Sequence, residues 1–166
     1  MFDSRTPLCT DLVEGNIERF EEQFNKVLIG VSSFHDFVEK EKSYHNLMIG
    51  ALLYMLGIYH VRSNRVAGRG RYDIAMIPTE MFKDKNRPVI LEFKVAKEPL
   101  KEKEYSEEEL LALANDALLQ IKDKSYIAEY EDKYQKDDFL LVGIGAQGKR
   151  CRVVIYNYKN PTLHAG

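Results

Sequence analysis

Cysteine is scarce in this sequence, and other marks of a secreted protein are absent as well. Only two cysteines, Cys9 and Cys151, occur in 166 residues, too few for the disulfide framework of a small extracellular domain. The N-terminus does not begin with basic residues followed by an apolar stretch, as a secretory signal would. We therefore expect a protein of a reducing compartment, the cytoplasm.

The sequence also lacks a long apolar run and an excess of charge. Its longest nearly apolar stretch, residues 47–59, is shorter than the roughly 20 residues that a membrane span needs. Lysine and arginine total 24 against 26 acidic residues, which gives a formal net charge of -2. We expect no membrane partner, and any site for a polyanion has to come from a local group of basic residues.

What the sequence does contain is an ordered series of helical and strand patterns. Its length and its 45% hydrophobic content predict one globular domain over residues 1–166. Three segments have apolar residues at helical spacing: 10–29, 32–57 and 109–131. Five segments have strand patterns: 58–68, 71–78, 87–97, 137–149 and 150–158. The order α-α-β-β-β-α-β-β predicts a mixed α/β fold in which helices flank a β-sheet.

A glycine-rich motif, "GIGAQG" at residues 143–148, matches the dinucleotide-binding pattern and, with Lys149, most of a P-loop. Both motifs need a strand before them and a helix N-terminus after them, to direct backbone N–H groups at phosphates. Here β-branched, alternating residues follow, and Arg150 stands where a P-loop has serine or threonine. The sequence favours a turn between two strands, and a nucleotide-binding protein is the weaker alternative.

The segment "VILEFKVAK", residues 89–97, carries two charged side chains within a strand pattern typical of a protein core. Because side chains alternate across a strand, Glu92 and Lys94 share one face. If this strand pairs with residues 71–78 as a hairpin with matched apolar faces, Asp73 lies beside them. Two buried carboxylates and one ammonium group would cost several kcal/mol unless something compensates for them.

A divalent cation is the compensation that these residue types favour. Carboxylate oxygens are hard ligands that suit Mg²⁺ or Mn²⁺, so Asp73 and Glu92 are the predicted metal ligands, with the backbone carbonyl of Phe93 as a third. Lys94 could orient a water molecule or stabilise negative charge on a phosphoryl group. This combination predicts hydrolysis of phosphodiester bonds. A structural salt-bridge network at the edge of the sheet is the alternative reading.

The residues "RYD" at 71–73 and "EFK" at 92–94 resemble the signature of the PD-(D/E)xK nuclease superfamily, with Tyr72 in place of proline. The resemblance covers residues 34–156 and implies a restriction-endonuclease-like core over 34–158, preceded by a helical extension over 1–33. Within the superfamily, the sequence is most similar to the nuclease-like C-terminal domain of bacterial proteins that begin with an AAA-type ATPase-like region. It therefore implies a domain excised from a longer protein, or one associated with such a region.

The resemblance also implies roles for residues outside the signature. It implies Glu41 as an acidic metal ligand on the preceding helix and Gln120 as a catalytic polar residue on the following one. Further candidates contact nucleic acid, with DNA favoured over RNA: Arg62, Arg65, Arg69, Arg71, Lys124 and Tyr126. Two functions stay open. The first is a metal-dependent nuclease; the second is a catalytically silent nuclease-fold module that binds nucleic acid or a partner protein.

Overall fold

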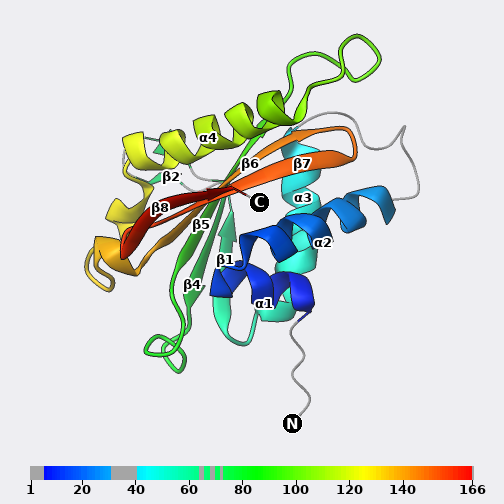
Figure 1. The fold of residues 1–166 in the computed structure, drawn as a ribbon. Helices are drawn as coiled ribbons and strands as arrows, with labels where there is room; N and C mark the ends of the chain where they lie inside the picture. Colours follow the sequence, from blue (N-terminus) through cyan, green and yellow to red (C-terminus); the bar gives the residue numbers. More distant parts are fainter. Residues whose placement is uncertain (1–5, 31–40, 64–65, 68–69, 72, 166) are drawn as a thin grey trace.

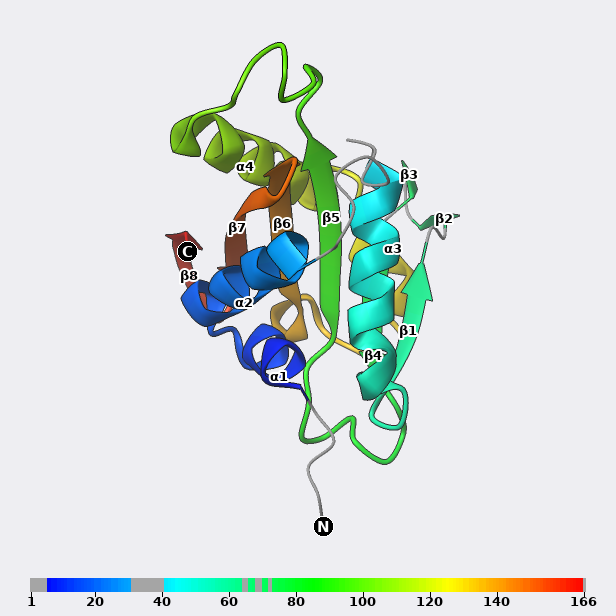
Figure 2. The same cartoon turned by 90° about the vertical axis from the view of Figure 1, so that its right-hand side faces the viewer.

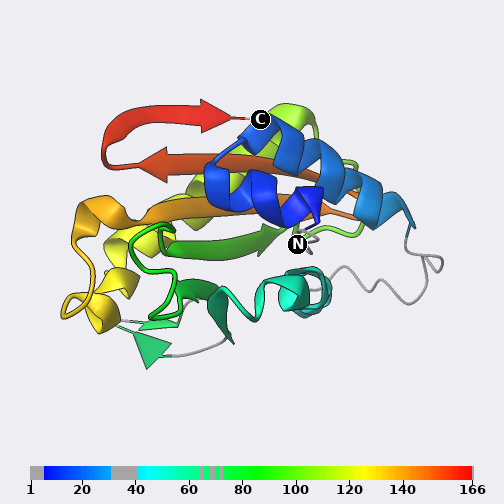
Figure 3. The same ribbon diagram turned by 90° about the horizontal axis from the view of Figure 1, so that it is seen from below.

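The computed structural model describes residues 6–30, 41–63, 66–67, 70–71 and 73–165. Its main feature is a six-stranded sheet with the strand order β1-β4-β5-β6-β7-β8. The strands are β1 Tyr59–Ser63, β4 Ile74–Pro78, β5 Val89–Val95, β6 Leu140–Gln147, β7 Arg150–Asn157 and β8 Asn160–Ala165. Figure 3 shows them side by side in this order. Neighbouring strands are antiparallel except β5 and β6, which are parallel. A separate ribbon pairs β2 (Val66–Ala67) with β3 (Gly70–Arg71).

Helices cover both faces of this sheet (Figures 1 and 2). The helices α1 (Pro7–Glu14), α2 (Ile17–Gly30) and α3 (Glu41–Leu52) lie on one face, and α4 (Glu107–Asp123) lies on the other. The described ranges also contain three short 3-10 helices: η1 (Leu53–Met55) after α3, and η2 (Tyr126–Tyr130) and η3 (Lys136–Asp138) after α4. The predicted fold class, a mixed α/β restriction-endonuclease-like fold with flanking helices, is confirmed. No helix in the described ranges is long and apolar enough to cross a lipid bilayer.

The alternation of side chains along the strands divides the core into two clusters. Val89, Leu91 and Phe93 of β5 pack with α1, α2 and α3, whereas Ile90 packs with α4 and η2. Both cysteines lie in the first cluster, where Cys9 of α1 and Cys151 of β7 are 0% and 2% exposed and form no disulfide. Burial raises the pKa of both thiols.

The N-terminal region differs from the single amphipathic helix predicted over residues 10–29. The structure contains two helices, because Gly15 adopts a left-handed conformation (φ 78°) that ends α1. The first helix begins earlier than predicted, with Thr6 as its N-cap, whose side chain accepts a hydrogen bond from the N–H of Cys9. The start of the helix predicted over 32–57 lies outside the described residues, and its α-helical part ends at Leu52.

The glycine-rich segment 143–148 also differs from its predicted place. Gly143 and Gly145 lie within β6, and the turn to β7 falls at Gly148, whose φ is 57°. A strand follows this turn, so the nucleotide-binding reading of the motif is wrong. A Cβ atom on Gly143 would lie 2.1 Å from the carbonyl oxygen of Ala114, and one on Gly145 equally close to that of Leu110. These glycines therefore let α4 rest directly on the backbone of β6.

Candidate active site

The two carboxylates predicted as metal ligands meet where the chain enters β4. Ile74 lies opposite Leu91 in the antiparallel pair of β4 and β5, so Asp73 comes beside Glu92. Glu92 Oε2 accepts a hydrogen bond from the backbone N–H of Asp73 at 3.2 Å. Asp73 Oδ2 accepts one from the N–H of Phe93 at 2.8 Å. Asp73 is 8% exposed and Glu92 is 3% exposed. Their predicted adjacency is confirmed.

The helix α4 adds a glutamine that bridges the charged residues of β5. Lys94 Nζ donates a hydrogen bond to Gln120 Oε1 at 2.5 Å. The amide nitrogen of Gln120 donates to Glu92 Oε1, and it also contacts the hydroxyl of Tyr126 at 3.1 Å. One network thus joins two residues of the strand to two from α4 and η2. Tyr126 is fully buried, and its hydroxyl accepts the hydrogen bond from Gln120.

Burial and like charge dominate the electrostatics of this network. The pKa of Glu92 rises to about 8, first because burial removes water from its carboxylate and second because Asp73 lies close by. Burial also raises the pKa of Asp73, against an opposing effect of the hydrogen bond from Phe93. The positive charge of Lys94 opposes both increases without cancelling them. In the absence of a further cation, Glu92 therefore holds a proton at neutral pH.

The first turn of α3 approaches the same site from the other face of the sheet. Glu41 reaches solvent, yet the surrounding protein still removes part of its hydration and raises its pKa, and the charge of Asp73 raises it further. One helical turn later, the buried His45 donates a hydrogen bond from Nε2 to the carbonyl oxygen of Asp73 at 3.1 Å. His45 was not among the residues predicted for the site, although His45 lies four residues after Glu41 and therefore on the same face of α3.

The predicted nucleic-acid contacts are only partly brought to this site. Arg62 of β1 forms an ion pair with Glu129 at 3.5 Å, and its guanidinium lies over the ring of Tyr130, so its charge is already compensated. Lys124 caps the end of α4, four residues beyond Gln120. The remaining predicted arginines are not described by their side chains: Arg65 and Arg69 lie outside the described residues, and Arg71 is placed only through the backbone of β3.

The oxygens at this site fit a hard divalent cation. Asp73 and Glu92 supply two carboxylates, and the carbonyl of Phe93 lies on the same strand edge as its N–H, which points at Asp73. Within the described residues, no group of three or more histidine, cysteine, aspartate or glutamate side chains is arranged to hold a metal ion. The donor set is therefore two acidic side chains with a backbone oxygen, which suits Mg²⁺ or Mn²⁺ that keeps several waters. Glu41 lies near enough to Asp73 for the charge of each carboxylate to affect the other, so Glu41 adds negative charge to the site.

A buried glutamine missed by the sequence analysis fixes the segment between β5 and α4. Gln147, at the end of β6, is 1% exposed. Its amide nitrogen donates to the carbonyls of Glu98 and Lys103 at 3.0 and 2.7 Å, and its oxygen accepts from the N–H of Tyr105 at 2.8 Å. Gln147 lies within the glycine-rich segment 143–148, which was predicted as a turn, so no buried role was predicted for it. The segment it holds leads from Lys94 directly to the helix that carries Gln120.

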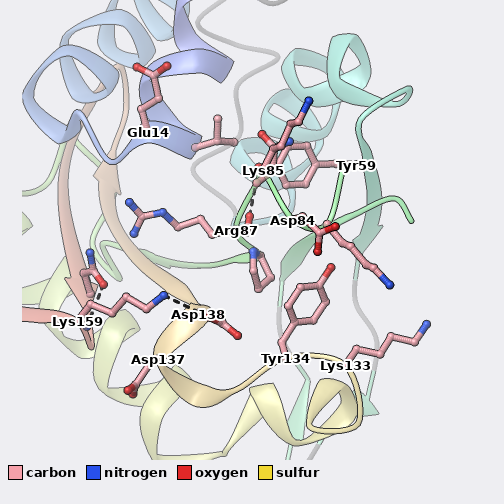
Figure 4. Close-up of a pocket in the computed structure, with 15 residues that line it drawn as sticks. Glu14, Tyr59, Asp84, Lys85, Arg87, Lys133, Tyr134, Asp137, Asp138 and Lys159 are labelled. Atoms are coloured by element: carbon pink, nitrogen blue, oxygen red, sulfur yellow. Dashed lines mark hydrogen bonds and ion pairs between the residues drawn. The ribbon is translucent and has the colours of Figure 1, made fainter. Parts of the chain in front are cut away.

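A hollow of about 830 Å³ lies at the opposite end of β5 (Figure 4). It is bordered by Arg87 and Pro88, which precede the strand, and by charged residues of both signs, including the ion pair of Lys159 with Asp138 at 3.3 Å. None of the residues of the carboxylate network lines it. Its size alone therefore does not make it the candidate site.

One comparison with known proteins found a match, and the matched residues include those of the carboxylate network. A family model described as the PD-(D/E)XK nuclease superfamily matches residues 39–155, which include α3, the sheet from β1 to most of β7, and α4. No match was found among the curated proteins. None was found among the solved structures.

Proposed function

Because the chain belongs to the PD-(D/E)XK nuclease superfamily, we propose that it is a nuclease that hydrolyses phosphodiester bonds with the help of Mg²⁺ or Mn²⁺. The superfamily consists mainly of nucleases that use divalent metal ions. The proposal for this chain goes further, because it assigns the reaction to Asp73, Glu92, Lys94 and Gln120. DNA is the favoured substrate, and RNA is the alternative.

The observation that carries the proposal is the continuous hydrogen-bonded network of these four residues. Ionising both carboxylates of a buried pair costs free energy, first through the loss of hydration and second through repulsion, and a purely structural core would not gain from such a pair. A salt bridge between Lys94 and Glu92 would offer the simplest structural explanation. Instead, Lys94 donates to Gln120, and the amide nitrogen of Gln120 donates to Glu92. The ammonium of Lys94 therefore does not pair directly with Glu92, and the carboxylate oxygens remain available as ligands of a cation.

The reaction proposed at this site is attack of water on phosphorus. A cation bound by Asp73, Glu92 and the carbonyl of Phe93 would lower the pKa of a bound water and stabilise the charge that develops on the phosphoryl oxygens. A bond from the water oxygen to phosphorus forms as the bond to the leaving sugar oxygen breaks. The water loses one proton, and the leaving oxygen gains one. The products are a phosphomonoester and an alcohol.

The side chains of the network would position and polarise the reactants. Lys94, half-buried at the end of β5, would donate to the attacked phosphate and stabilise its negative charge. Gln120 would hold the Lys94 ammonium in place, and His45 would fix the backbone of Asp73. The proposal includes an association with an ATPase-like region, which the sequence resemblance implies.

The test combines metal titration with cleavage assays. Isothermal titration of Mn²⁺ and Mg²⁺ would compare the wild type with Asp73→Asn and Lys94→Ala, and labelled single- and double-stranded DNA and RNA would report cleavage. We expect metal binding and cleavage by the wild type, neither by Asp73→Asn, and metal binding without cleavage by Lys94→Ala. The control is Lys83→Ala, which removes an exposed lysine paired with Glu80 in the loop between β4 and β5.

The possible outcomes separate the two functions that the sequence leaves open. Nucleic acid that the wild type binds but never cleaves, with or without metal, would support the silent binding module instead. Cleavage by Lys94→Ala at the wild-type rate would remove Lys94 from the reaction and leave the metal assignment intact.

A further inference from the structure

A second group of side chains with the chemistry of nucleic-acid recognition lies on the other side of α4 from the carboxylate network. It surrounds a hollow of about 360 Å³ between the end of α4, η2 and β7. In Figures 1 and 3 these elements and the turn between β7 and β8 lie at one end of the sheet. We call this the tyrosine–lysine hollow, defined by Lys122, Ser125, Glu131, Lys136, Tyr156 and Tyr158.

Two tyrosines form the aromatic part of this hollow. The rings of Tyr156 and Tyr158 meet edge to face, with centroids 4.8 Å apart. The ammonium of Lys122 lies 3.3 Å from the centroid of Tyr156, and that of Lys136 lies 4.9 Å from the centroid of Tyr158. Each ring is only partly buried. The hollow therefore combines exposed aromatic surface with two positive charges.

These two charges lack acidic partners within the described part of the chain. Neither Lys122 nor Lys136 lies within 4.0 Å of a described carboxylate, although Glu131 lines the same hollow. The pKa of Lys122 is lowered, first by burial and second by the charge of Lys136, so the two ammonium groups repel one another. An anion placed between them would relieve this repulsion.

The ligand that fits both features is a phosphate joined to an aromatic base. An ammonium group over an exposed aromatic ring is held less strongly than one that donates a charge-assisted hydrogen bond to phosphate. A phosphate would therefore draw the ammonium groups away from the tyrosine rings. The rings would then be free to stack against a base. A simple acidic peptide offers the charge but not the aromatic face.

The backbone beside the hollow supports a binding role. Ser125 adopts a left-handed conformation (φ 51°), the only non-glycine residue with positive φ among those described. Such a conformation is unfavourable for a residue with a side chain, and strained residues gather at functional sites. Here it turns the chain sharply from α4 into η2 and brings η2 over the hollow.

We propose that the tyrosine–lysine hollow binds a base and its phosphate in a single-stranded segment of the nucleic acid that the active site cleaves. The inference rests on the proposed nuclease function. Tyr156 of β7 is in register with Ile90 of β5 through Leu141 of β6, two residues from Glu92, so Tyr156 and Glu92 lie roughly 12 Å apart at the usual strand spacing and rise. Lys124 caps the end of α4, two residues after Lys122 of the hollow. A strand of a few nucleotides spans this distance.

The test measures binding in the absence of metal, so that cleavage does not interfere. Fluorescence anisotropy in EDTA would follow a labelled oligothymidylate of about 12 nucleotides, a length within single-strand site sizes. The variants are Tyr158→Leu and Lys136→Ala. Their matched controls are Tyr54→Leu, an exposed tyrosine on η1, and Lys133→Ala, an exposed lysine outside the hollow.

We expect each variant to change a different property of binding. Tyr158→Leu should raise the Kd roughly tenfold with an unchanged salt dependence, because it removes stacking. Lys136→Ala should reduce the slope of log K against log salt by about 0.7, because it removes one phosphate contact. The controls should bind as the wild type does. Thermal unfolding of each variant would verify that it is folded.

Several outcomes would overturn the inference without touching the nuclease. Binding by both variants with the Kd and salt slope of the wild type would do so, as would competition by polyglutamate as strong as by oligothymidylate. Conversely, loss of binding in the variants of a protein that cleaves no substrate with Mg²⁺ or Mn²⁺ would retain the hollow as a nucleic-acid site and reject the proposed reaction.

Discussion

At the scale of single residues, the close approach of Asp73 and Glu92 explains why a core strand carries charge. Each carboxylate accepts a hydrogen bond from the backbone of the other's segment, so neither can turn away. The sequence predicted this pair because side chains alternate along strands and the apolar faces of a hairpin must match. His45 was not predicted, because its spacing of four from Glu41 is common on helices and does not indicate a hydrogen bond to a backbone carbonyl.

The raised pKa of Glu92 makes the metal-free protein less stable at high pH. Its folded-state pKa of about 8 exceeds the ordinary 4.5, so the folded protein binds the extra proton between these values. The contribution of this proton to the free energy of unfolding is fully present below about pH 4.5 and is lost as the pH rises through about 8, by on the order of 5 kcal/mol at most. The raised pKa of Asp73 acts in the same direction.

We therefore expect Glu92→Gln to flatten this pH dependence. In EDTA, the Tm of the wild type should fall between pH 5 and pH 8.5, while that of the variant should fall clearly less over the same interval, because Asp73 is still present. Differential scanning calorimetry across the interval would measure both. Parallel declines of the two proteins would show that Glu92 titrates as an ordinary glutamate.

Gln120 should act as a positioning residue, because it holds Lys94 and Glu92 without carrying a charge. We expect Gln120→Leu to lower kcat about 10- to 100-fold, as outer-shell substitutions at metal sites commonly do. The KM and the Tm should change little. A variant that loses stability in proportion to activity would indicate a structural role instead. Tyr126→Phe, which removes one hydroxyl, should have a smaller effect on kcat.

At the scale of secondary-structure elements, the contact of α4 with β6 fixes the distance between Gln120 and the carboxylates. A capping box of Ser106 and Glu109 fixes the start of α4. The glycines of β6 were misread as a turn, because a glycine that permits close helix packing and one that permits a turn look alike in sequence. The structure distinguishes the two, because it places Gly143 and Gly145 inside β6 and the turn after them.

We expect Gly143→Ala to be strongly destabilising. The added Cβ would lie 2.1 Å from the carbonyl oxygen of Ala114 and 2.8 Å from the backbone nitrogen of Leu118, neither of which can move without shifting α4. The loss should be about 3 kcal/mol or more, roughly 10 °C in Tm for a chain of this size. Gly50→Ala is the matched control, since no atom lies within 4 Å of its added Cβ in α3. It should stabilise by about 0.5–1 kcal/mol.

At the scale of the whole molecule, the candidate site lies between two separately packed cores. Asp73 receives a hydrogen bond from α3 on one face, while Gln120 reaches Glu92 from α4 on the other. The sequence predicted a mixed sheet with helices but not the strand β8, because its segment contains a proline and few β-branched residues. The break at Gly15 was missed because the apolar periodicity continues across it.

A metal ion that joins these two halves should stabilise the whole fold. At 100 times its Kd, Mn²⁺ should add about 2.7 kcal/mol, or roughly 5–10 °C in Tm. The increase should be larger at pH 8.5 than at pH 6, because binding requires Glu92 to lose its proton. EDTA should reverse it, and Asp73→Asn should show none. Equal shifts in the wild type and Asp73→Asn would place the metal elsewhere.

The two buried thiols can report the order in which parts of the molecule unfold. Cys9 on α1 donates a hydrogen bond to the carbonyl of Ala51 on α3, and Cys151 lies within the sheet. Neither can meet an alkylating reagent until the elements around it separate. Mass spectrometry of the timed reaction therefore distinguishes two events within one sample. Earlier labelling of Cys9 would mean that the N-terminal helices peel from the sheet as a unit, whereas simultaneous labelling would mean that the chain opens all at once.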